Sequence, residues 1–316
     1  MGNIAPYKKD FNHNMHRRKR GHDYRTPWKY HITIGKDPSC PDFSRLVWRE
    51  LTPEGVKVDY SQIGYEVWRG ISRISEIEPK IQLYRYVIMP DHIHILLRVR
   101  ERMEKVLGEV IHSFKSEITS SLRKIHGRPD FVVFTENYND RIIYSHRNLN
   151  AVYDYIRQNP YRLAVRRERP DFFSKRRGLM VGEREVQGYG NLFLLRNPFK
   201  MALVVHRADT EEDFNRKLED CLYFAANGGV VVSAFISARE KQIRREVEAA
   251  GGRVILVHDR PLAEREKPGK HDFELCCSGQ LLLISPVSYL DLPRAEHPPR
   301  WQCLEMNKLA EEIAKN

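Results

Sequence analysis

The amino-acid sequence predicts two domains of different class: an α+β domain with helices packed on an antiparallel sheet, followed by an α/β domain. In the first half, a pair of adjacent strands lies among amphipathic helices in the order β-α-β-β-α-β-α. In the second half, strands that are apolar on both faces alternate with helical stretches. The charge changes at the same place. Residues 1–180 contain 34 Lys and Arg against 21 Asp and Glu, and the remainder contains 19 against 21.

The first 28 residues show no apolar periodicity, and we interpret them as a basic N-terminal arm. Their densest charge is the run Arg17, Arg18, Lys19 and Arg20. A basic first half is typical of a protein that binds a phosphate backbone, although a solvated basic surface would have the same composition. We therefore take these four residues as candidate DNA contacts.

The α+β domain is expected to span residues 29–180. Strands are predicted from runs rich in Tyr, Ile, Val and Leu, and helices from apolar positions that recur every three or four residues. Pro90-Asp91 is the expected hairpin turn, and Asn159-Pro160 is expected to end the last helix. The predicted elements are, in order, strand Tyr30–Ile34, helix Gln62–Ser75, strands Ile81–Met89 and His92–Val99, helix Glu104–His126, strand Phe131–Phe134 and helix Asn148–Gln158.

The second domain is expected to span residues 181–316, after an Arg-rich segment at Arg162–Arg177 that suits a connector or a DNA-facing segment. Its alternation of apolar strands and helices favours a parallel, Rossmann-like sheet. The predicted strands are Met201–His206, Val230–Phe235, Arg253–His258 and Leu281–Ser285, and the predicted helices are Glu211–Asn227 and Ala238–Ala250.

The pattern His92-Ile93-His94 has the strongest chemical content in the sequence. On a strand, the two histidines point to the same face, so that two imidazoles can share one metal ion. With 13 histidines in 316 residues, chance alone supplies about 0.5 such pairs, so the pattern is weak by itself.

A second pattern combines a phenol with an amide. Tyr155 and Asn159 are four residues apart on a predicted helix, so they lie on one face. The simpler interpretation is a packing tyrosine followed by an asparagine that ends the helix before Pro160. The two patterns gain meaning only together.

Together they resemble the single-tyrosine HUH transposases, most of all the REP-associated tyrosine transposases. The resemblance covers about Lys29–Arg162 and rests on two segments in this order, Ile88-Met89-Pro90-Asp91-His92-Ile93-His94-Ile95-Leu96-Leu97 and Tyr155-Ile156-Arg157-Gln158-Asn159-Pro160. It implies a ferredoxin- or RRM-like core, a Mg²⁺ or Mn²⁺ cofactor, and cleavage of hairpin-bearing single-stranded DNA through a 5′-phosphotyrosine. The implied site has His92 and His94 as metal ligands, Tyr155 as the nucleophile and Asn159 as the third ligand, with Gln158 as its rival.

The resemblance implies a DNA-cutting and strand-transferring enzyme, and two alternatives stay open. One is a domesticated nuclease with a host or defence role, and the other is a DNA-binding module without catalysis. Arg141 and Arg147, which precede the nucleophile helix, are further candidate DNA contacts. We expect a cytoplasmic, nucleoid-associated protein without a membrane span, and the sequence leaves a homodimer open.

The second domain resembles the DNA-processing protein A (DprA) family over about Met201–Pro286. The likeness rests on the glycine-serine turn at Gly228–Phe235 and on the strand at Gly251–Val257. The family has glycine where this chain has Ala234. A strand entered through a Gly-Gly turn would explain the same residues without a ligand.

Overall fold

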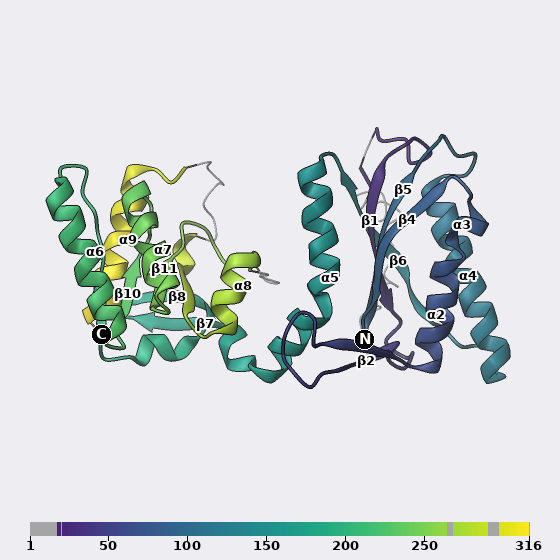
Figure 1. The fold of residues 1–316 in the computed structure, drawn as a ribbon, viewed down its shortest axis with the longest axis horizontal. Coiled ribbons are helices and arrows are strands. Elements are labelled where there is room, and N and C mark those ends of the chain that lie inside the picture. The colour runs from purple at the N-terminus through teal and green to yellow at the C-terminus, as the bar shows by residue number, and fades with distance from the viewer. Residues whose placement is uncertain (1–17, 20, 264–267, 290–296, 316) are drawn as a thin grey trace, which may run out of the picture. The chain divides into compact units, whose positions relative to one another are not determined.

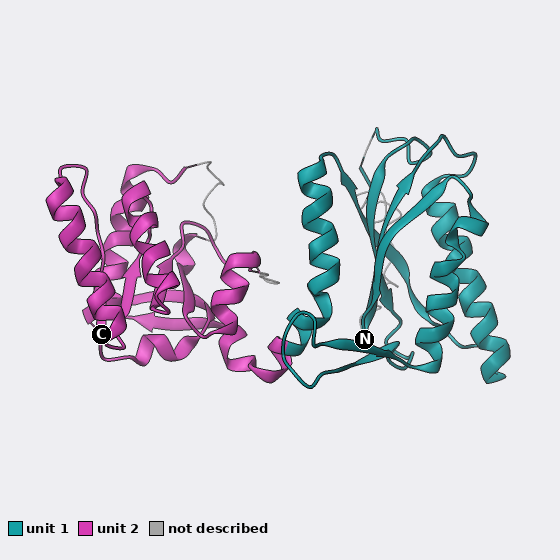
Figure 2. Ribbon diagram, in the orientation of Figure 1, with its two compact units in different colours: residues 1–164 teal, residues 165–316 magenta. Residues whose placement is uncertain are grey.

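The computed structural model describes residues 18–19, 21–263, 268–289 and 297–315. Arg17 and Arg20, two of the predicted DNA contacts, lie outside the described residues. The chain divides into two compact units, residues 1–164 and 165–316 (Figure 2). The boundary falls before the predicted 180/181, because strand β7 (Ser174–Val181) pairs within the sheet of the second unit.

The N-terminal unit is built on a four-stranded antiparallel sheet of order β4-β5-β1-β6 (Figure 1). Strands β1 and β5 are therefore central, and each exchanges hydrogen bonds on both sides. A separate two-stranded sheet joins β2 and β3. The elements are β1 (Lys29–Lys36), β2 (Ser44–Val47), β3 (Lys57–Tyr60), α2 (Gln62–Ser72), α3 (Ile74–Ile77), β4 (Ile81–Ile88), β5 (His92–Val99), α4 (Leu107–His126), β6 (Phe134–Ile143) and α5 (His146–Glu168).

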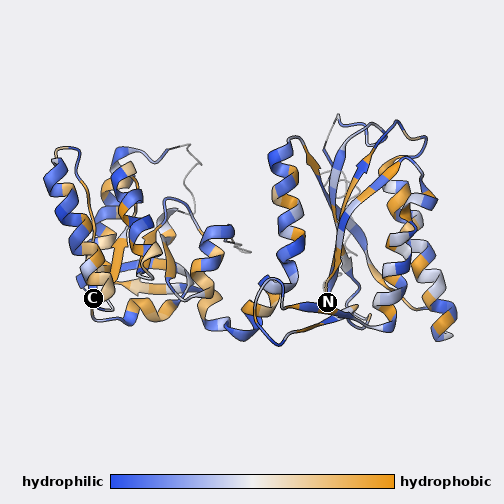
Figure 3. Ribbon diagram, viewed as in Figure 1, coloured by the Kyte–Doolittle hydropathy of each residue, from blue (hydrophilic) through white to orange (hydrophobic). Residues whose placement is uncertain are grey.

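Helices cover both faces of this sheet. On one face, Tyr30 and Ile32 of β1 and Ile95 of β5 pack in the main core with α2 and α4. On the other face, Leu96 of β5 packs with Ile156 of α5 in a smaller cluster. Helix α5 is largely hydrophilic along its length (Figure 3), so this second face is only partly sealed by apolar contacts.

Helix α5 passes through Pro160, and the predicted stop at Asn159-Pro160 is therefore wrong. Proline costs a helix about 3 kcal/mol, chiefly through its missing N–H and its clash with the preceding turn. Asn159 Nδ2, just before the proline, donates to the Tyr155 carbonyl at 3.2 Å. Beyond the proline, fully buried Ala164 packs against Leu46 and Val56 of the β2–β3 region. Burial of this last part outweighs the local cost.

Two further segments differ from the sequence prediction. Strand β6 occupies Phe134–Ile143 rather than Phe131–Phe134, because its polar residues lie on an edge strand that is half exposed. The described part of residues 1–28 is also joined to the domain. Tyr24 packs against the main core and donates a hydrogen bond to Asp140 at 2.8 Å.

The C-terminal unit has a six-stranded mixed sheet of order β7-β8-β12-β11-β10-β9. Strands β9 to β12 are parallel, as the alternation predicted, and β7 and β8 add an antiparallel hairpin that the sequence did not predict. Helices α6, α7 and α8 pack on one face of the sheet and α9 on the other. The remaining elements are β8 (Arg184–Gly190), β9 (Lys200–Ala202), α6 (Glu211–Ala226), β10 (Val230–Ser233), α7 (Ala238–Ala249), β11 (Arg253–Val257), α8 (Lys270–Cys277), β12 (Leu281–Pro286) and α9 (Arg300–Lys315).

The four parallel strands β9 to β12 lie in the sheet in the same order as in the sequence. Ligand sites in open α/β sheets favour the point where strand order reverses, and the order β9-β10-β11-β12 has no reversal among the described strands. The resemblance to the DprA family stays a prediction. Within the described residues, no helix is both long enough and apolar enough to cross a bilayer.

Candidate active site of the N-terminal unit

The β4–β5 hairpin fixes the position of His92. Met89 N donates to His92 O at 2.8 Å, which closes the predicted Pro90-Asp91 turn. The turn is also attached from outside, because Lys36 N donates to Asp91 O at 2.8 Å and Phe43 N donates to Pro90 O at 2.9 Å. Backbone groups of neighbouring segments therefore hold the start of β5 in place.

The two histidines of the His-x-His pattern face each other. Their Nε2 atoms are 3.1 Å apart. The Nδ1 atom of His92 lies 2.7 Å from Asp91 Oδ1. A carboxylate oxygen can only accept a hydrogen bond, so Nδ1 is the donor. Since the hydrogen bond of one ring nitrogen sets the tautomer, this contact leaves the Nε2 lone pair of His92 free toward His94.

His94 is fixed in the same way by β1. Its Nδ1 atom lies 2.9 Å from Thr33 Oγ1 and 3.1 Å from His31 Nε2. Both partners can accept a hydrogen bond, and in the tautomer with the proton on Nδ1 the Nε2 lone pair of His94 is directed toward His92.

His31 is a member of this site that the sequence did not reveal. Burial, together with the positive charges of Arg141 and His92, lowers the pKa of His31 to about 4, so its ring is neutral and its Nε2 can accept. In the sequence, His31 and Thr33 alternate with core residues along β1. This alternation indicates a site residue only when the pairing of Thr33 with His94 is known, and these two residues are 61 positions apart.

Helix α5 brings Tyr155 to His94 and His31. The centroid of its ring lies 5.4 Å from that of His94 and 6.0 Å from that of His31. Within the described part of the chain, the Tyr155 hydroxyl has no hydrogen-bond partner. Tyr153 has a different position, because its hydroxyl accepts from Arg85 at 2.6 Å and its ring lies under the same guanidinium.

The third ligand expected from the sequence is an amide. Among the described residues, no three His, Cys, Asp or Glu side chains are placed to hold one ion. The predicted rivals Asn159 and Gln158 both lie on α5 beside Tyr155. Gln158 is buried at 8% exposure, and Asn159 donates its amide hydrogen to the Tyr155 carbonyl, which leaves its carbonyl oxygen as an acceptor.

The predicted DNA contacts that the structure describes fall into two groups. Arg18 forms an ion pair with Asp140, so its charge is compensated. Lys19 donates to the neutral Tyr144 hydroxyl at 2.7 Å and keeps its charge. Arg141, on β6, and Arg147, in the first turn of α5, are exposed and without an acidic partner in the described part of the chain.

A family model matches part of the N-terminal unit. Residues 57–159 match the model of the family described as "Transposase IS200 like", and the match includes both histidines of the pattern, Tyr155 and Asn159. This segment is therefore similar to IS200-like transposases. It lies in the N-terminal unit, and it contains β4, β5 and the part of α5 that carries Tyr155.

Individual relatives of this part of the chain are distant. An uncharacterised protein of Haemophilus influenzae is 23% identical over 175 residues, which covers 49% of this chain and 92% of that protein. The REP-associated tyrosine transposase bound to a REP hairpin is 14% identical, with a TM-score of 0.33 over 45% of this chain and 72% of that one. A Deinococcus radiodurans protein provisionally assigned as a transposase is 13% identical. Its TM-score is 0.29, and the match covers 44% of this chain and 95% of that protein.

Proposed function

We propose that this chain is a metal-dependent endonuclease and strand transferase that cuts single-stranded, hairpin-bearing DNA through a tyrosine nucleophile. The observation that carries the proposal is the contact of Tyr155 with His94, whose Nε2 atom lies 3.1 Å from that of His92. The match of residues 57–159 to a transposase family supports the same reaction class.

The donor set fits a divalent ion. The two Nε2 atoms are 3.1 Å apart, close enough for both to bind one ion. His92 and His94 would hold the ion with an amide oxygen from Asn159, or from Gln158. When bound, Mg²⁺ or Mn²⁺ would supply Lewis-acid stabilisation of charge on the scissile phosphate.

The residues of the chain supply position and the nucleophile. Asp91 and Thr33 form hydrogen bonds with the two imidazoles and fix their orientation, so the site is formed before substrate arrives. The Tyr155 oxygen attacks phosphorus and loses its proton, and the bond from phosphorus to the 3′ oxygen breaks, which leaves a free 3′-OH. The 5′-phosphotyrosine retains the energy of the phosphodiester, so a 3′-OH can reverse the reaction and join a strand.

The test is formation of a covalent adduct. The chain is incubated with Mn²⁺ and an end-labelled single strand that carries an inverted repeat from the DNA beside its own gene. We expect a denaturation-resistant adduct that disappears with EDTA and in Tyr155→Phe, a change that removes only a hydroxyl. The proposal is falsified if Tyr155→Phe still forms the adduct.

Tyr153→Phe is the matched control. It removes the same atom from the same helix, at a side chain that contacts Arg85 instead of the histidines. We expect this variant to form the adduct at the wild-type level. An adduct lost only in Tyr153→Phe would move the nucleophile two residues upstream.

A further inference from the structure

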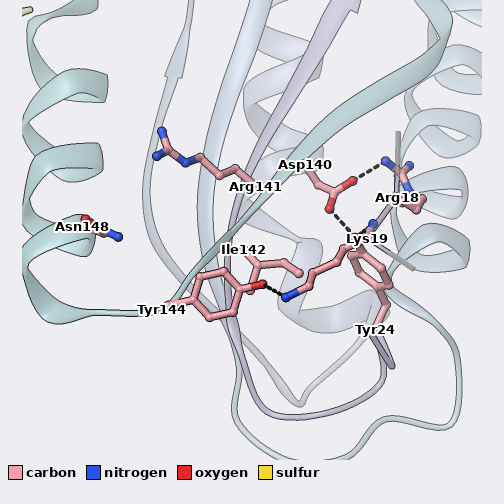
Figure 4. Close-up of a pocket in the computed structure, with 8 residues that line it drawn as sticks. All are labelled: Arg18, Lys19, Tyr24, Asp140, Arg141, Ile142, Tyr144 and Asn148. Atoms are coloured by element: carbon pink, nitrogen blue, oxygen red, sulfur yellow. Dashed lines mark hydrogen bonds and ion pairs between the residues drawn. The ribbon is translucent and has the colours of Figure 1, made fainter. Parts of the chain in front are cut away.

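A cavity of about 380 Å³ lies along the outer edge of β6 in the N-terminal unit (Figure 4). This volume is within the range of about 300–1,000 Å³ that small-molecule sites occupy. Three segments line it: the residues before β1, the end of β6 with the residue after it, and the first turn of α5. The lining residues are Arg18, Lys19, Tyr24, Asp140, Arg141, Ile142, Tyr144 and Asn148.

On one wall of this cavity, the charges of Arg18 and Asp140 compensate each other. The Asp140 carboxylate, with its side chain only 2% exposed, accepts from Tyr24 and forms an ion pair with Arg18. The Arg18 guanidinium also lies 3.8 Å from the ring centroid of Tyr138. This wall therefore fixes residues 18–24 on the sheet edge without offering charge to a ligand.

The opposite side offers positive charge and an aromatic ring. Lys19 donates only to a neutral hydroxyl, that of Tyr144, and Arg141 has no acidic partner among the described residues. Tyr144 is 54% exposed although Trp28 and Lys19 hold its ring, with centroid distances of 5.5 Å to the Trp28 ring and 4.8 Å to the Lys19 Nζ. Cations beside an exposed ring are the features that bind the phosphates and bases of single strands.

The cavity is next to the proposed nucleophile. Arg141 is paired with His31 across β1 and β6, so the two side chains share the sheet face under α5. Asn148 precedes Tyr155 by seven residues on α5, which places both on one side of the helix and about 10 Å apart along its axis. That distance corresponds to at most about three stacked nucleotides, and to fewer in an extended strand.

We propose that this cavity is a nucleotide subsite, in which one base of the single strand stacks on Tyr144 while Lys19 and Arg141 hold its phosphates. The inference deepens the proposed function, since it assumes that the strand passes Tyr155. It assigns the N-terminal segment a second role: the segment completes a binding pocket through Lys19, besides covering the core through Tyr24.

The test measures coupling between Tyr144 and a single base. Binding of the hairpin-bearing strand is measured by fluorescence anisotropy in the Tyr155→Phe background, with one abasic position moved along the strand nucleotide by nucleotide. With Tyr144 present, we expect one position, within about three nucleotides of the covalent attachment point, to raise Kd about 10-fold when abasic. In Tyr144→Ala, Kd should already be raised about 10-fold, and the same abasic position should have no further effect.

Two matched variants separate stacking from folding. Tyr144→Phe keeps the ring and should bind like the parent. Tyr65→Ala removes a tyrosine of nearly the same exposure, 55%, from α2 on the other face of the sheet, and should leave Kd unchanged. Lys19→Gln should reduce the slope of log Kd against log salt by about one, as expected for one lost phosphate contact.

The outcomes are distinguishable from those of the cleavage proposal. If the abasic profile of Tyr144→Ala equals that of the parent, the subsite is wrong even when wild-type protein forms the adduct. If one base couples to Tyr144 but wild-type protein forms no adduct, the cleavage proposal fails and the cavity stands as a base-binding pocket. Equal loss of binding in Tyr144→Phe and Tyr144→Ala would also contradict stacking.

Discussion

Consecutive residues of the same strands point to opposite faces of the four-stranded sheet, and these two faces have different chemistry. In β1, Tyr30 and Ile32 are fully buried in the main core, and His31, between them, faces α5 and the candidate site. In β5, Ile95 belongs to the core and its neighbour His94 to the site. One face is closed by apolar packing, and the other holds polar side chains that bond to one another. The effect of a substitution should therefore depend on which face its side chain joins.

The largest expected effect comes from a charge on the core face. Ile95→Asp places a carboxylate at a position with 0% exposure, opposite Ile32. Burying an unpaired charge costs more than the ~4–5 kcal/mol that marks exceptional single substitutions, which is enough to unfold a marginally stable domain. Circular dichroism and thermal unfolding should show loss of the cooperative transition of the N-terminal unit. A native-like transition would contradict the assignment of this face.

A substitution of His94, one residue earlier on the same strand, should affect activity more than stability. His94→Ala removes one of the two facing imidazoles, so we expect adduct formation to fall at least ~100-fold while the free energy of unfolding changes by about 1–2 kcal/mol. Adduct yield and a urea unfolding curve measure the two quantities. Full activity in this variant would remove His94 from the metal site.

His31→Ala tests the support behind the site. Loss of a hydrogen-bond partner of a metal ligand typically weakens metal affinity by about 10–100-fold. We expect that range for Mn²⁺, with the maximal rate restored at high Mn²⁺ because Thr33 still accepts from His94. His31→Gln, which keeps an acceptor, should lie closer to wild type. A rate that stays low at saturating Mn²⁺ would mean that His31 contributes directly to the reaction.

The smallest expected effect separates the two amide rivals on α5. Asn159→Ala should weaken Mn²⁺ affinity several-fold, since an amide oxygen is one ligand of three. Asn159→Asp keeps an oxygen but removes the donor to the Tyr155 carbonyl, so it should retain metal binding and lose about 1 kcal/mol of stability. If Gln158→Ala lowers Mn²⁺ affinity and Asn159→Ala does not, the third ligand is Gln158.

Local patterns predicted the parts of the site that share one strand or one helix. Alternation placed His92 and His94 on one face, and four-residue spacing placed Tyr155 with Asn159, which the structure keeps on one helix. The approach of Tyr155 to His94 followed only from the family resemblance, because no local pattern encodes which helix covers which face. His31 needed the pairing of β1 with β5, a long-range register that alternation alone does not set.

The errors in the fold have the same origin. Pro160 is a local helix breaker, yet burial of Ala164 against the β2–β3 region continues the helix. Strand β6 is polar because it lies at an edge, where exposed positions need no apolar side chain. In both cases tertiary contacts decided an outcome that local propensity could not.

Strand β7 limits how the chain can be shortened. It begins at Ser174 and pairs with β8, so a fragment that stops at residue 180 would keep most of β7 and lose its partner. The orphaned strand would present unpaired N–H and C=O groups, which recruit strands from other molecules and promote aggregation. A fragment that ends at Glu168 keeps α5 whole and contains neither β7 nor Phe173, which packs against the core of the second unit. Protein made for crystals or for single-molecule work on the first unit should therefore end there.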